Sequence, residues 1–192
     1  MKDDATLVDN FVDCFEKLDD LRTYFELDPL AWELAFGESD EDGLKRWKPI
    51  RVSTERTALD RLYDVLPAPF PPLYEQLILS YRWAQVDLGT FRLLANPPSQ
   101  NLDRLLKEVS HDRGMMEMLI PNGCLQFGKG PDVDYDAVCF DFHRRGKDGD
   151  CPVVKIDHEE ILCNFRFRKV AELAPSFRSL MERVIKESNC EA

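Results

Sequence analysis

The sequence predicts an α+β fold, with a mixed, mainly antiparallel sheet flanked by helices and an extra helical segment at the N-terminus. Three observations predict this class: helical spacings of apolar residues dominate the first half of the chain, strand-like runs gather within residues 125–156, and a helical pattern closes the chain. Strands and helices do not alternate regularly enough for a doubly wound sheet. The 192 residues, 44% of them hydrophobic, are enough to form a hydrophobic core.

The N-terminal residues carry the apolar stripe of an amphipathic helix over residues 6–26. Apolar side chains recur there at intervals of three and four residues: Leu7, Phe11, Phe15, Leu18, Leu21 and Phe25. Pro29 stops this helix, and a short second helix is expected around residues 30–36. Residues 37–43 then form a solvated loop bounded by two glycines.

The central part of the chain predicts more helices and a short hairpin. Ser53 or Thr54 can cap a helix that runs to Leu66, where a proline-rich stretch ends it. A helix over residues 73–83 follows. The pieces 86–88 and 91–94 flank Gly89-Thr90 and read as a hairpin or a bulged strand, and residues 102–109 and 112–119 read as two short helices.

Three strands and a last helix complete the expected elements. The strands cover residues 125–127, 137–142 and 153–156. A hydrophilic, turn-rich stretch joins the second strand to the third, which predicts an antiparallel hairpin. The closing helix is expected over residues 175–186, with Ser176 just inside its start.

The charge of the chain is unevenly distributed. The sequence has 36 acidic and 25 basic residues, a net charge of −11. Residues 1–50 alone contain 14 acidic and 6 basic residues, a net charge of −8. We therefore divide the chain into an acidic helical extension, residues 1–52, and an α+β domain, residues 53–192. The negative charge disfavours direct binding to nucleic acid or to an anionic membrane and favours a basic protein partner.

The N-terminus and the cysteines predict a cytoplasmic protein. Met1 is followed by Lys2, Asp3 and Asp4 and by no long apolar run, unlike a secretory signal, and no stretch is apolar enough for a transmembrane helix. The six cysteines are scattered along a chain that is large enough to fold without disulfides. We expect them to be reduced thiols.

Two patterns in the sequence suggest metal sites, but neither fits one. The alternate aspartates of residues 132–136 resemble the start of a calcium loop, but Ala137 stands where glycine is needed and His143 where a bidentate glutamate is needed. Several potential zinc ligands fall in one region, and their spacings match no standard zinc module: Cys139, His143, Cys151, His158 and Cys163. We predict no metal and no cofactor.

The sequence has no catalytic signature. GxSxG, the phosphate-binding loop and GxGxxG are all missing, and residues 127–131 read as a turn. Asp157 and the following residues 158–160, His-Glu-Glu, offer acid and base groups. They directly follow a strand, where a helix cap or a polar turn is the commoner use. The sequence therefore predicts a protein that is not an enzyme, with a metal- or thiol-dependent enzyme as an alternative.

Three features are candidate partner-binding sites. Asp132, Asp134 and Asp136 would project from one face of an extended chain as an exposed acidic strip. The solvated loop offers a second acidic group, and Trp83 is an aromatic candidate for an interface anchor. The acidic residues of that loop are Glu38, Asp40, Glu41 and Asp42.

Residues 55–187 resemble the SUKH superfamily, which includes the fungal cell-wall-assembly regulator and many bacterial immunity proteins. The resemblance rests on a helix ending in Leu66-Pro67 and on the following Pro-Pro-Leu-Tyr-Glu-Gln-Leu-Ile-Leu-Ser-Tyr segment, residues 71–81. It continues in the strand-like runs 137–141 and 151–160 and in the start of the last helix, residues 174–180. The chain departs from the family pattern in its acidic extension and in having Trp-Ala-Gln where the family has Asn-Gly-Gly.

The resemblance implies a mixed or mainly antiparallel sheet flanked by helices, and a role in binding rather than catalysis. It implies an immunity protein that neutralises a cognate toxin, for example a basic nuclease, which an acidic inhibitor would attract over a distance. An intracellular scaffold or regulator with several partners is the alternative that the eukaryotic members imply.

Overall fold

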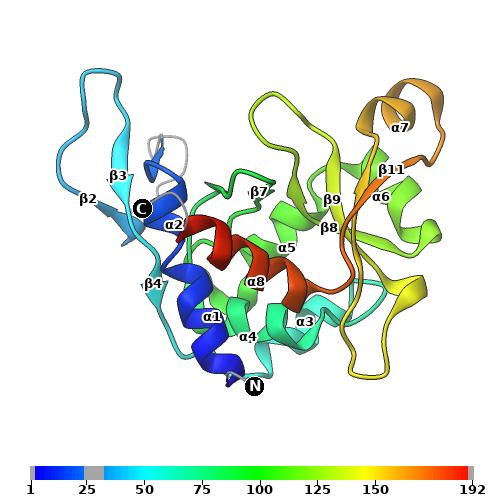
Figure 1. Cartoon of the computed structure of the whole chain (residues 1–192), viewed down its shortest axis with the longest axis horizontal. Coiled ribbons are helices and arrows are strands. Elements are labelled where there is room, and N and C mark those ends of the chain that lie inside the picture. The colour runs from blue at the N-terminus through cyan, green and yellow to red at the C-terminus, as the bar shows by residue number, and fades with distance from the viewer. Residues whose placement is uncertain (1–2, 24–32, 190–192) are drawn as a thin grey trace.

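The computed structural model describes residues 3–23 and 33–189 (Figure 1). These residues fold around one six-stranded sheet with the order β11-β10-β9-β8-β7-β6, and every neighbouring pair of strands is antiparallel. In chain order the strands are β6 (Val86–Asp87), β7 (Arg92–Leu93), β8 (Cys124–Lys129), β9 (Ala137–Asp141), β10 (Val153–Ile156) and β11 (Lys169–Ala174). The predicted fold class, α+β with an antiparallel sheet flanked by helices, is confirmed.

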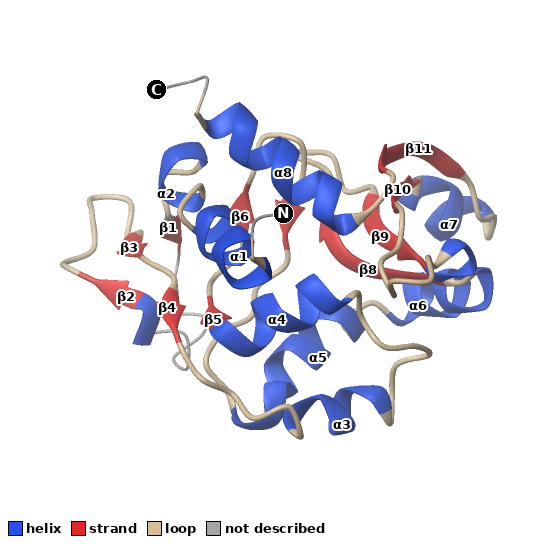
Figure 2. Cartoon of the chain, turned by 60° about the horizontal axis from the view of Figure 1, so that its bottom comes forward, coloured by secondary structure: helices blue, strands red, loops and turns tan. Residues whose placement is uncertain are grey.

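Helices pack on both faces of this sheet (Figure 2). The helices that share a hydrophobic core with one face, called here the inner face, are α1 (Asp4–Val12), α2 (Phe15–Leu18), α3 (Ala58–Tyr63), α4 (Pro72–Ser80), α5 (Asp103–Ser110) and α8 (Phe177–Ser188). The opposite, outer face is covered by α6 (Arg113–Leu119) and α7 (His158–Asn164). No helix of the described chain is long and apolar enough to cross a bilayer.

Two small sheets and several short 3₁₀ segments complete the described chain. The strands β1 (Arg22–Thr23), β3 (Lys45–Trp47) and β2 (Ala35–Phe36) form an antiparallel sheet in that order, and β4 (Ile50–Arg51) pairs with β5 (Tyr81–Arg82). The 3₁₀ segments include Gln100–Leu102, Ile120–Asn122 and Phe142–Arg144.

Aromatic rings fill the core on the inner face. Phe127 of β8 and Phe140 of β9 stack with their centroids 4.0 Å apart. Tyr74 of α4 and Phe177 of α8 meet both rings edge-on at 5.2–5.6 Å. Such edge-to-face contacts add to the stability that buried area alone provides.

Side chains alternate between the two faces because successive residues of a strand point to opposite sides. Leu125 and Phe127 point inward, whereas Cys124 and Gln126 point outward. The strand pairing shifts by one residue before Gly128, where a Cβ atom would lie 2.8 Å from the Arg92 carbonyl oxygen. Only glycine allows this close approach.

The N-terminal segment differs from the single helix predicted over residues 6–26. It forms α1 and α2 and then enters β1 through Leu21, whose positive φ of 47° ends the helical path. Phe11 of α1 contacts Phe177 of α8 edge-on at 6.3 Å, and Phe15 contacts Trp83 at 6.5 Å. The division of the chain at residue 52 stays a prediction, but the apolar side of α1 belongs to the core of the inner face.

Several other predicted elements are confirmed, among them the hairpin β6–β7, the hairpin β9–β10, and the helices α3, α5, α6 and α8. Two predictions were wrong in part. The helix expected around residues 30–36 is wrong at Ala35–Phe36, which form β2. Residues 33 and 34 are in 3₁₀ conformation, and residues 30–32 lie outside the described residues. The helix expected over residues 73–83 ends at Ser80, because the chain then pairs with β4. The helix α7 and the strand β11 were not predicted.

Candidate functional site

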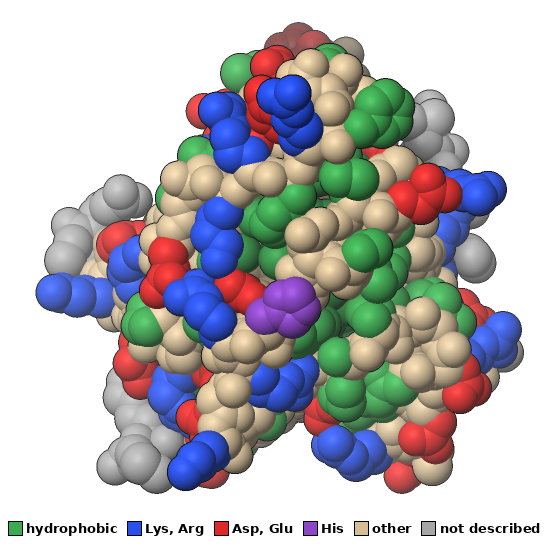
Figure 3. Space-filling view, turned by 90° about the vertical axis from the view of Figure 1, so that its right-hand side faces the viewer, with side chains coloured by type: hydrophobic (Ala, Val, Ile, Leu, Met, Phe, Trp, Pro, Cys, Tyr) green, Lys and Arg blue, Asp and Glu red, His purple; other side chains and the backbone are tan. Residues whose placement is uncertain are grey.

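The outer face of the sheet carries a hollow of about 360 Å³, which we call the outer groove. Its described lining comes from the start and body of α6, from β8, from the loop between β8 and β9, and from α7: His111, Asp112, Met115, Gln126, Lys129, Tyr135, His158 and Leu162. Figure 3 views the right-hand side of Figure 1, where α6 and α7 lie, and shows exposed hydrophobic side chains there among basic and acidic ones.

Two helix caps hold the walls of the outer groove. The Asp112 carboxylate accepts a hydrogen bond from the Met115 N–H at 3.0 Å, which starts α6. The Asp157 carboxylate accepts one from the Glu160 N–H at 2.8 Å, which starts α7, and it also pairs with Arg168. Side chains that accept from the third residue of a helix typically stabilise it by about 1 kcal/mol. The hydrogen bond from Arg168 lowers the pKa of Asp157, so the cap stays ionised at neutral pH.

Loop 130–136, the connection between β8 and β9, forms one wall of the outer groove. Arg92 Nε donates to the Gly130 carbonyl oxygen at 3.0 Å, and its guanidinium lies 5.9 Å from the centre of the Tyr135 ring. Tyr135 in turn meets the His158 ring edge-on at 5.8 Å. The tyrosine is thus held between a basic side chain and a histidine, with 56% of its surface exposed.

Two of the three aspartates predicted as an exposed strip turn inward, so this prediction was wrong in part. Lys155 of β10 pairs with the carboxylates of Asp134 and Asp136, the latter at 3.5 Å. The Asp136 carboxylate also accepts a hydrogen bond from the His158 N–H at 3.0 Å and lies 3.2 Å from His158 Nδ1. Among the three, Asp132 alone is exposed.

The reason for this difference is the backbone of the loop. Asp132 has a positive φ of 48°, so the segment turns and does not extend, and alternate side chains no longer share a face. Burial raises the pKa of Asp134, but hydrogen bonds from Lys155 and from the Asp136 N–H outweigh burial and bring the pKa below 3.8. The ion pair with Lys155 therefore persists at neutral pH.

Exposed apolar side chains lie on the elements that form this site. Val133 is 83% exposed on loop 130–136, and Leu162 and Phe165 are 48% and 80% exposed on α7 and just after it. Phe165 also has a positive φ of 52°, a conformation that costs a bulky residue on the order of 1 kcal/mol. An exposed aromatic residue held in a strained conformation contributes little to folding, which points to a role at the surface.

The charge of the outer groove differs from that of the whole chain. Lys129 lines the groove, and its ammonium group has no hydrogen bond or ion pair with another described residue. Asp112 is the acidic residue of the described lining, and its carboxylate caps α6. The groove thus combines an apolar surface with one available positive charge and two histidines.

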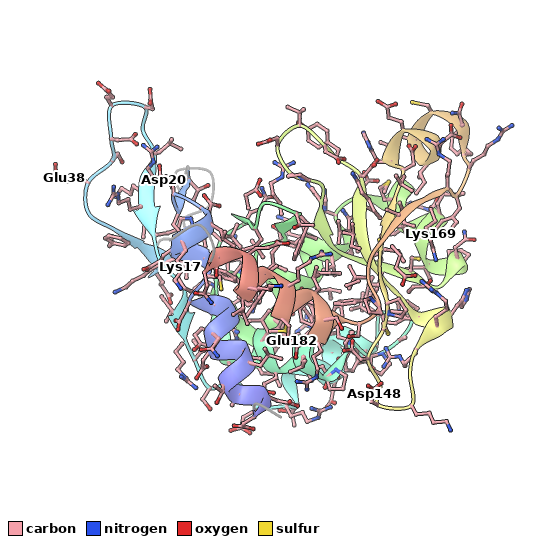
Figure 4. All side chains as sticks on the ribbon, viewed as in Figure 1. Lys17, Asp20, Glu38, Asp148, Lys169 and Glu182 are labelled. Carbon is pink, nitrogen blue, oxygen red and sulfur yellow. The ribbon has the colours of Figure 1, made fainter. Side chains whose placement is uncertain are left out.

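The second predicted acidic group lies at the other end of the molecule. Glu38, Asp40, Glu41 and Asp42 occupy the turn of the β2–β3 hairpin, which projects on the left of Figures 1 and 4, far from β11 and the labelled Lys169. Asp40 organises the turn: its carboxylate accepts hydrogen bonds from the Leu44 N–H at 2.9 Å and from Arg22 at 3.0 Å. The other three acidic side chains of this turn are exposed.

Trp83, the predicted aromatic anchor, is not on the surface, so this prediction was wrong. Its side chain is fully buried, and its indole Nε1 donates a hydrogen bond to the Leu94 carbonyl oxygen at 2.9 Å. The indole ring is thus packed in the core and its N–H group has a hydrogen-bond acceptor, as in most buried tryptophans. The exposed aromatic residues of the site are instead Tyr135 and Phe165.

The described cysteines form no disulfide. Cys163 is exposed, whereas Cys14, Cys124, Cys139 and Cys151 are buried. Burial raises the pKa of Cys124 to about 12 and that of Cys151 to about 11, and it also raises the pKa of Cys139 well above its ordinary value. Because the thiolate is the nucleophile, these three thiols are unreactive at neutral pH.

Sequence reasoning missed most of the groove residues. One signal was present: Asp157 and Glu160 have the spacing of a helix-capping pair, and His158 and Leu162 are four residues apart, on one side of the helix that follows. Nothing in the sequence showed that Lys129 or Met115 would meet them, because that depends on how the sheet pairs and where α6 packs.

Comparison with known proteins identifies no family for this chain. No protein-family model matches the chain, and no curated protein has a significantly similar sequence.

Proposed function

We propose that the protein is a non-catalytic protein-binding module and that the outer groove, with Val133 and Phe165 beside it, is its main partner-binding surface. The observation that carries the proposal is the grouping of exposed apolar residues around an apolar hollow. Such patches on soluble proteins mark interaction sites more often than chance, and aromatic residues are the commonest interface anchors. The raised thiol pKa values of the buried cysteines support binding over thiol chemistry.

The particular partner we propose is a toxin, which the protein would neutralise as an immunity protein inside the cell that makes it. This finer proposal rests on the resemblance of residues 55–187 to the SUKH superfamily. It also rests on the net charge of −11, which would speed the approach of a basic toxin. In this proposal the outer groove supplies the apolar anchor of the interface, and the acidic residues elsewhere act over a distance.

Substitutions in the groove test the binding module. Tyr135→Ala combined with Leu162→Ala should remove the partner from the purified protein, because both side chains would be anchors in the interface. Truncation of an interface anchor typically costs about 2 kcal/mol or more, roughly a thirtyfold loss of affinity. Val65→Ala is the matched control, since Val65 is 59% exposed and lies outside the groove. Equal partner recovery from all three proteins would overturn the assignment of the groove.

Co-expression tests the immunity role separately. A toxin encoded beside this gene should stop the growth of a host, and the wild-type protein should restore it, whereas the double groove variant should not. If no neighbouring gene encodes a toxin and several different proteins copurify at similar levels, the protein is a scaffold or regulator and not an immunity protein.

A further inference from the structure

A second cavity, of about 700 Å³, lies away from the outer groove, between the β4–β5 pair and the start of α5. Ile50, Val52 and Pro98 give it apolar walls. Thr54 and Ser99 add hydroxyl groups to the described lining. A cavity of this size accommodates a small organic molecule.

Arg82 of β5 is the unusual residue of this cavity, because it is buried and has no carboxylate partner in the described chain. Only 5% of its surface is exposed. One terminal nitrogen, Nη1, donates to the carbonyl oxygens of Ile78 at 2.6 Å and Tyr81 at 2.9 Å, and Nη2 donates to Thr54 Oγ1 at 2.6 Å. All three acceptors are neutral groups. They accept hydrogen bonds from Arg82, but they do not balance its positive charge.

A buried positive charge without an anion is costly, and proteins normally pair it. Desolvation by burial lowers the pKa of Arg82 to about 10, so the guanidinium is still charged at neutral pH. A guanidinium has five N–H donors, and the three hydrogen bonds above leave two for another group. An oxyanion in the cavity would accept hydrogen bonds from the remaining donors and would balance the positive charge.

The surroundings of Arg82 favour the same charge. Arg104 lines the cavity from the first turn of α5, where the helix dipole is positive. The nearby carboxylate of Asp103 pairs with Arg61 Nε at 3.1 Å and is thereby partly neutralised. Glu33 is the other acidic residue of the described lining, and it is exposed to solvent.

We propose that this cavity binds a small organic oxyanion, with a phosphate or carboxylate head group on Arg82 and Arg104 and an apolar body against Ile50, Val52 and Pro98. The residues involved are distinct from those of the outer groove, so this site is independent of the protein-binding function. A purely structural role for Arg82, in which it only satisfies the last carbonyl groups of α4, is the competing explanation.

Calorimetric titration of the full chain with four probes tests the proposal. Phenyl phosphate and benzoate carry the two head groups on an apolar ring, inorganic phosphate lacks the ring, and benzyl alcohol lacks the charge. Saturable binding of one molecule of phenyl phosphate or benzoate is expected, with weaker binding of inorganic phosphate and none of benzyl alcohol. The tighter of the two ring compounds identifies the head group. No saturable binding of either anion at millimolar concentrations, or equal binding of benzyl alcohol, would overturn the proposal.

Variants connect the binding to the arginines. Arg104→Gln should weaken the tighter ligand about tenfold, which corresponds to the loss of one charged hydrogen bond. Arg113→Gln is the control, because Arg113 is an exposed arginine at the start of α6 and outside this cavity. Arg82→Lys should also weaken binding, provided that thermal unfolding shows that this variant folds. If the variant does not fold, Arg104→Gln is the deciding test. Unchanged affinity in Arg104→Gln would refute the proposed site.

Discussion

The strands β8 and β9 contribute side chains to both faces of the sheet, but the two faces differ in what covers them. On the inner face, Phe127 and Phe140 stack on each other and are enclosed by Tyr74 and Phe177. On the outer face, the same strands present small side chains, among them Cys124, Ala137 and Cys139, under two short helices.

This difference separates stability from binding within one sheet. The inner face has the larger hydrophobic cluster and most of the large buried rings, so it provides more of the folding free energy than the outer face. Small residues on the outer face leave room between α6, α7 and loop 130–136, and the outer groove forms there. The inner face is therefore costly to change, whereas the groove can change with little loss of stability.

The largest expected effect is on the inner face. Phe140→Ala should lower the free energy of unfolding by about 3–5 kcal/mol, because it removes a fully buried ring and leaves a cavity. Urea denaturation followed by circular dichroism measures this loss. Cys139→Ala, one residue away and on the outer face, is the matched control and should cost far less. Equal losses of unfolding free energy in the two variants would show that the two faces contribute equally to stability.

A smaller effect is expected at Asp141, the last residue of β9. Asp141 is 5% exposed and accepts hydrogen bonds from Lys169 at 2.8 Å and from Arg144 at 2.9 Å. Asp141→Asn should lower the free energy of unfolding at pH 7 by about 1–2 kcal/mol, because exposed partners weaken the ion pairs. Urea midpoints of both proteins at pH 7 measure the difference.

The same substitution predicts a pH dependence. Burial raises the pKa of Asp141, but the hydrogen bonds from Lys169 and Arg144 outweigh it and bring the pKa below 3.8. A carboxyl group with a lowered pKa in the folded state stabilises the fold above its unfolded pKa, and this contribution is lost as the pH falls through the folded value. The gap between wild type and Asp141→Asn should therefore narrow below pH 3.8. A gap that is constant with pH would contradict the ion pairing.

A substitution beside the groove should stabilise the protein slightly. Phe165→Gly removes an exposed ring and places glycine where φ is positive, at the residue that ends α7. The free energy of unfolding should rise by about 0.5–1 kcal/mol, while the affinity for the protein partner falls. Thermal unfolding and partner recovery are measured on the same preparation. A loss of stability would mean that Phe165 is a structural residue.

The smallest effect on stability is expected at the β2–β3 hairpin. Replacing Glu38, Glu41 and Asp42 by their amides should change the free energy of unfolding by less than about 0.5 kcal/mol, because all three are exposed. If the acidic residues attract a basic partner, association should slow and lose part of its salt dependence. Asp40 is left unchanged because it holds the turn. Unchanged association rates at low salt would remove the hairpin from the binding process.

The hairpin substitutions test the role of the acidic residues in association better than a deletion of residues 1–50 would. Phe11 and Phe15 of that segment are fully buried. Its Asp9 carboxylate accepts a hydrogen bond from the Tyr81 hydroxyl at 2.8 Å. Removing residues 1–50 would open the core, so a loss of binding could not be assigned to charge.

The sequence by itself determined the α+β class, the hairpins β6–β7 and β9–β10 and most of the helices, because these depend on local periodicity and on turn residues. What it could not determine was where each side chain points once distant segments meet.

Only the tertiary structure decided the site. Lys155 lies 19 residues beyond Asp136 in the sequence and draws that carboxylate inward from a neighbouring strand, which no local pattern shows. Trp83 is buried because α2 and the chain near Leu94 pack around it. The outer groove exists because α6 and α7 meet over small residues of the sheet. Such long-range packing sets which polar groups are paired and which apolar residues remain exposed, and therefore where a partner can bind.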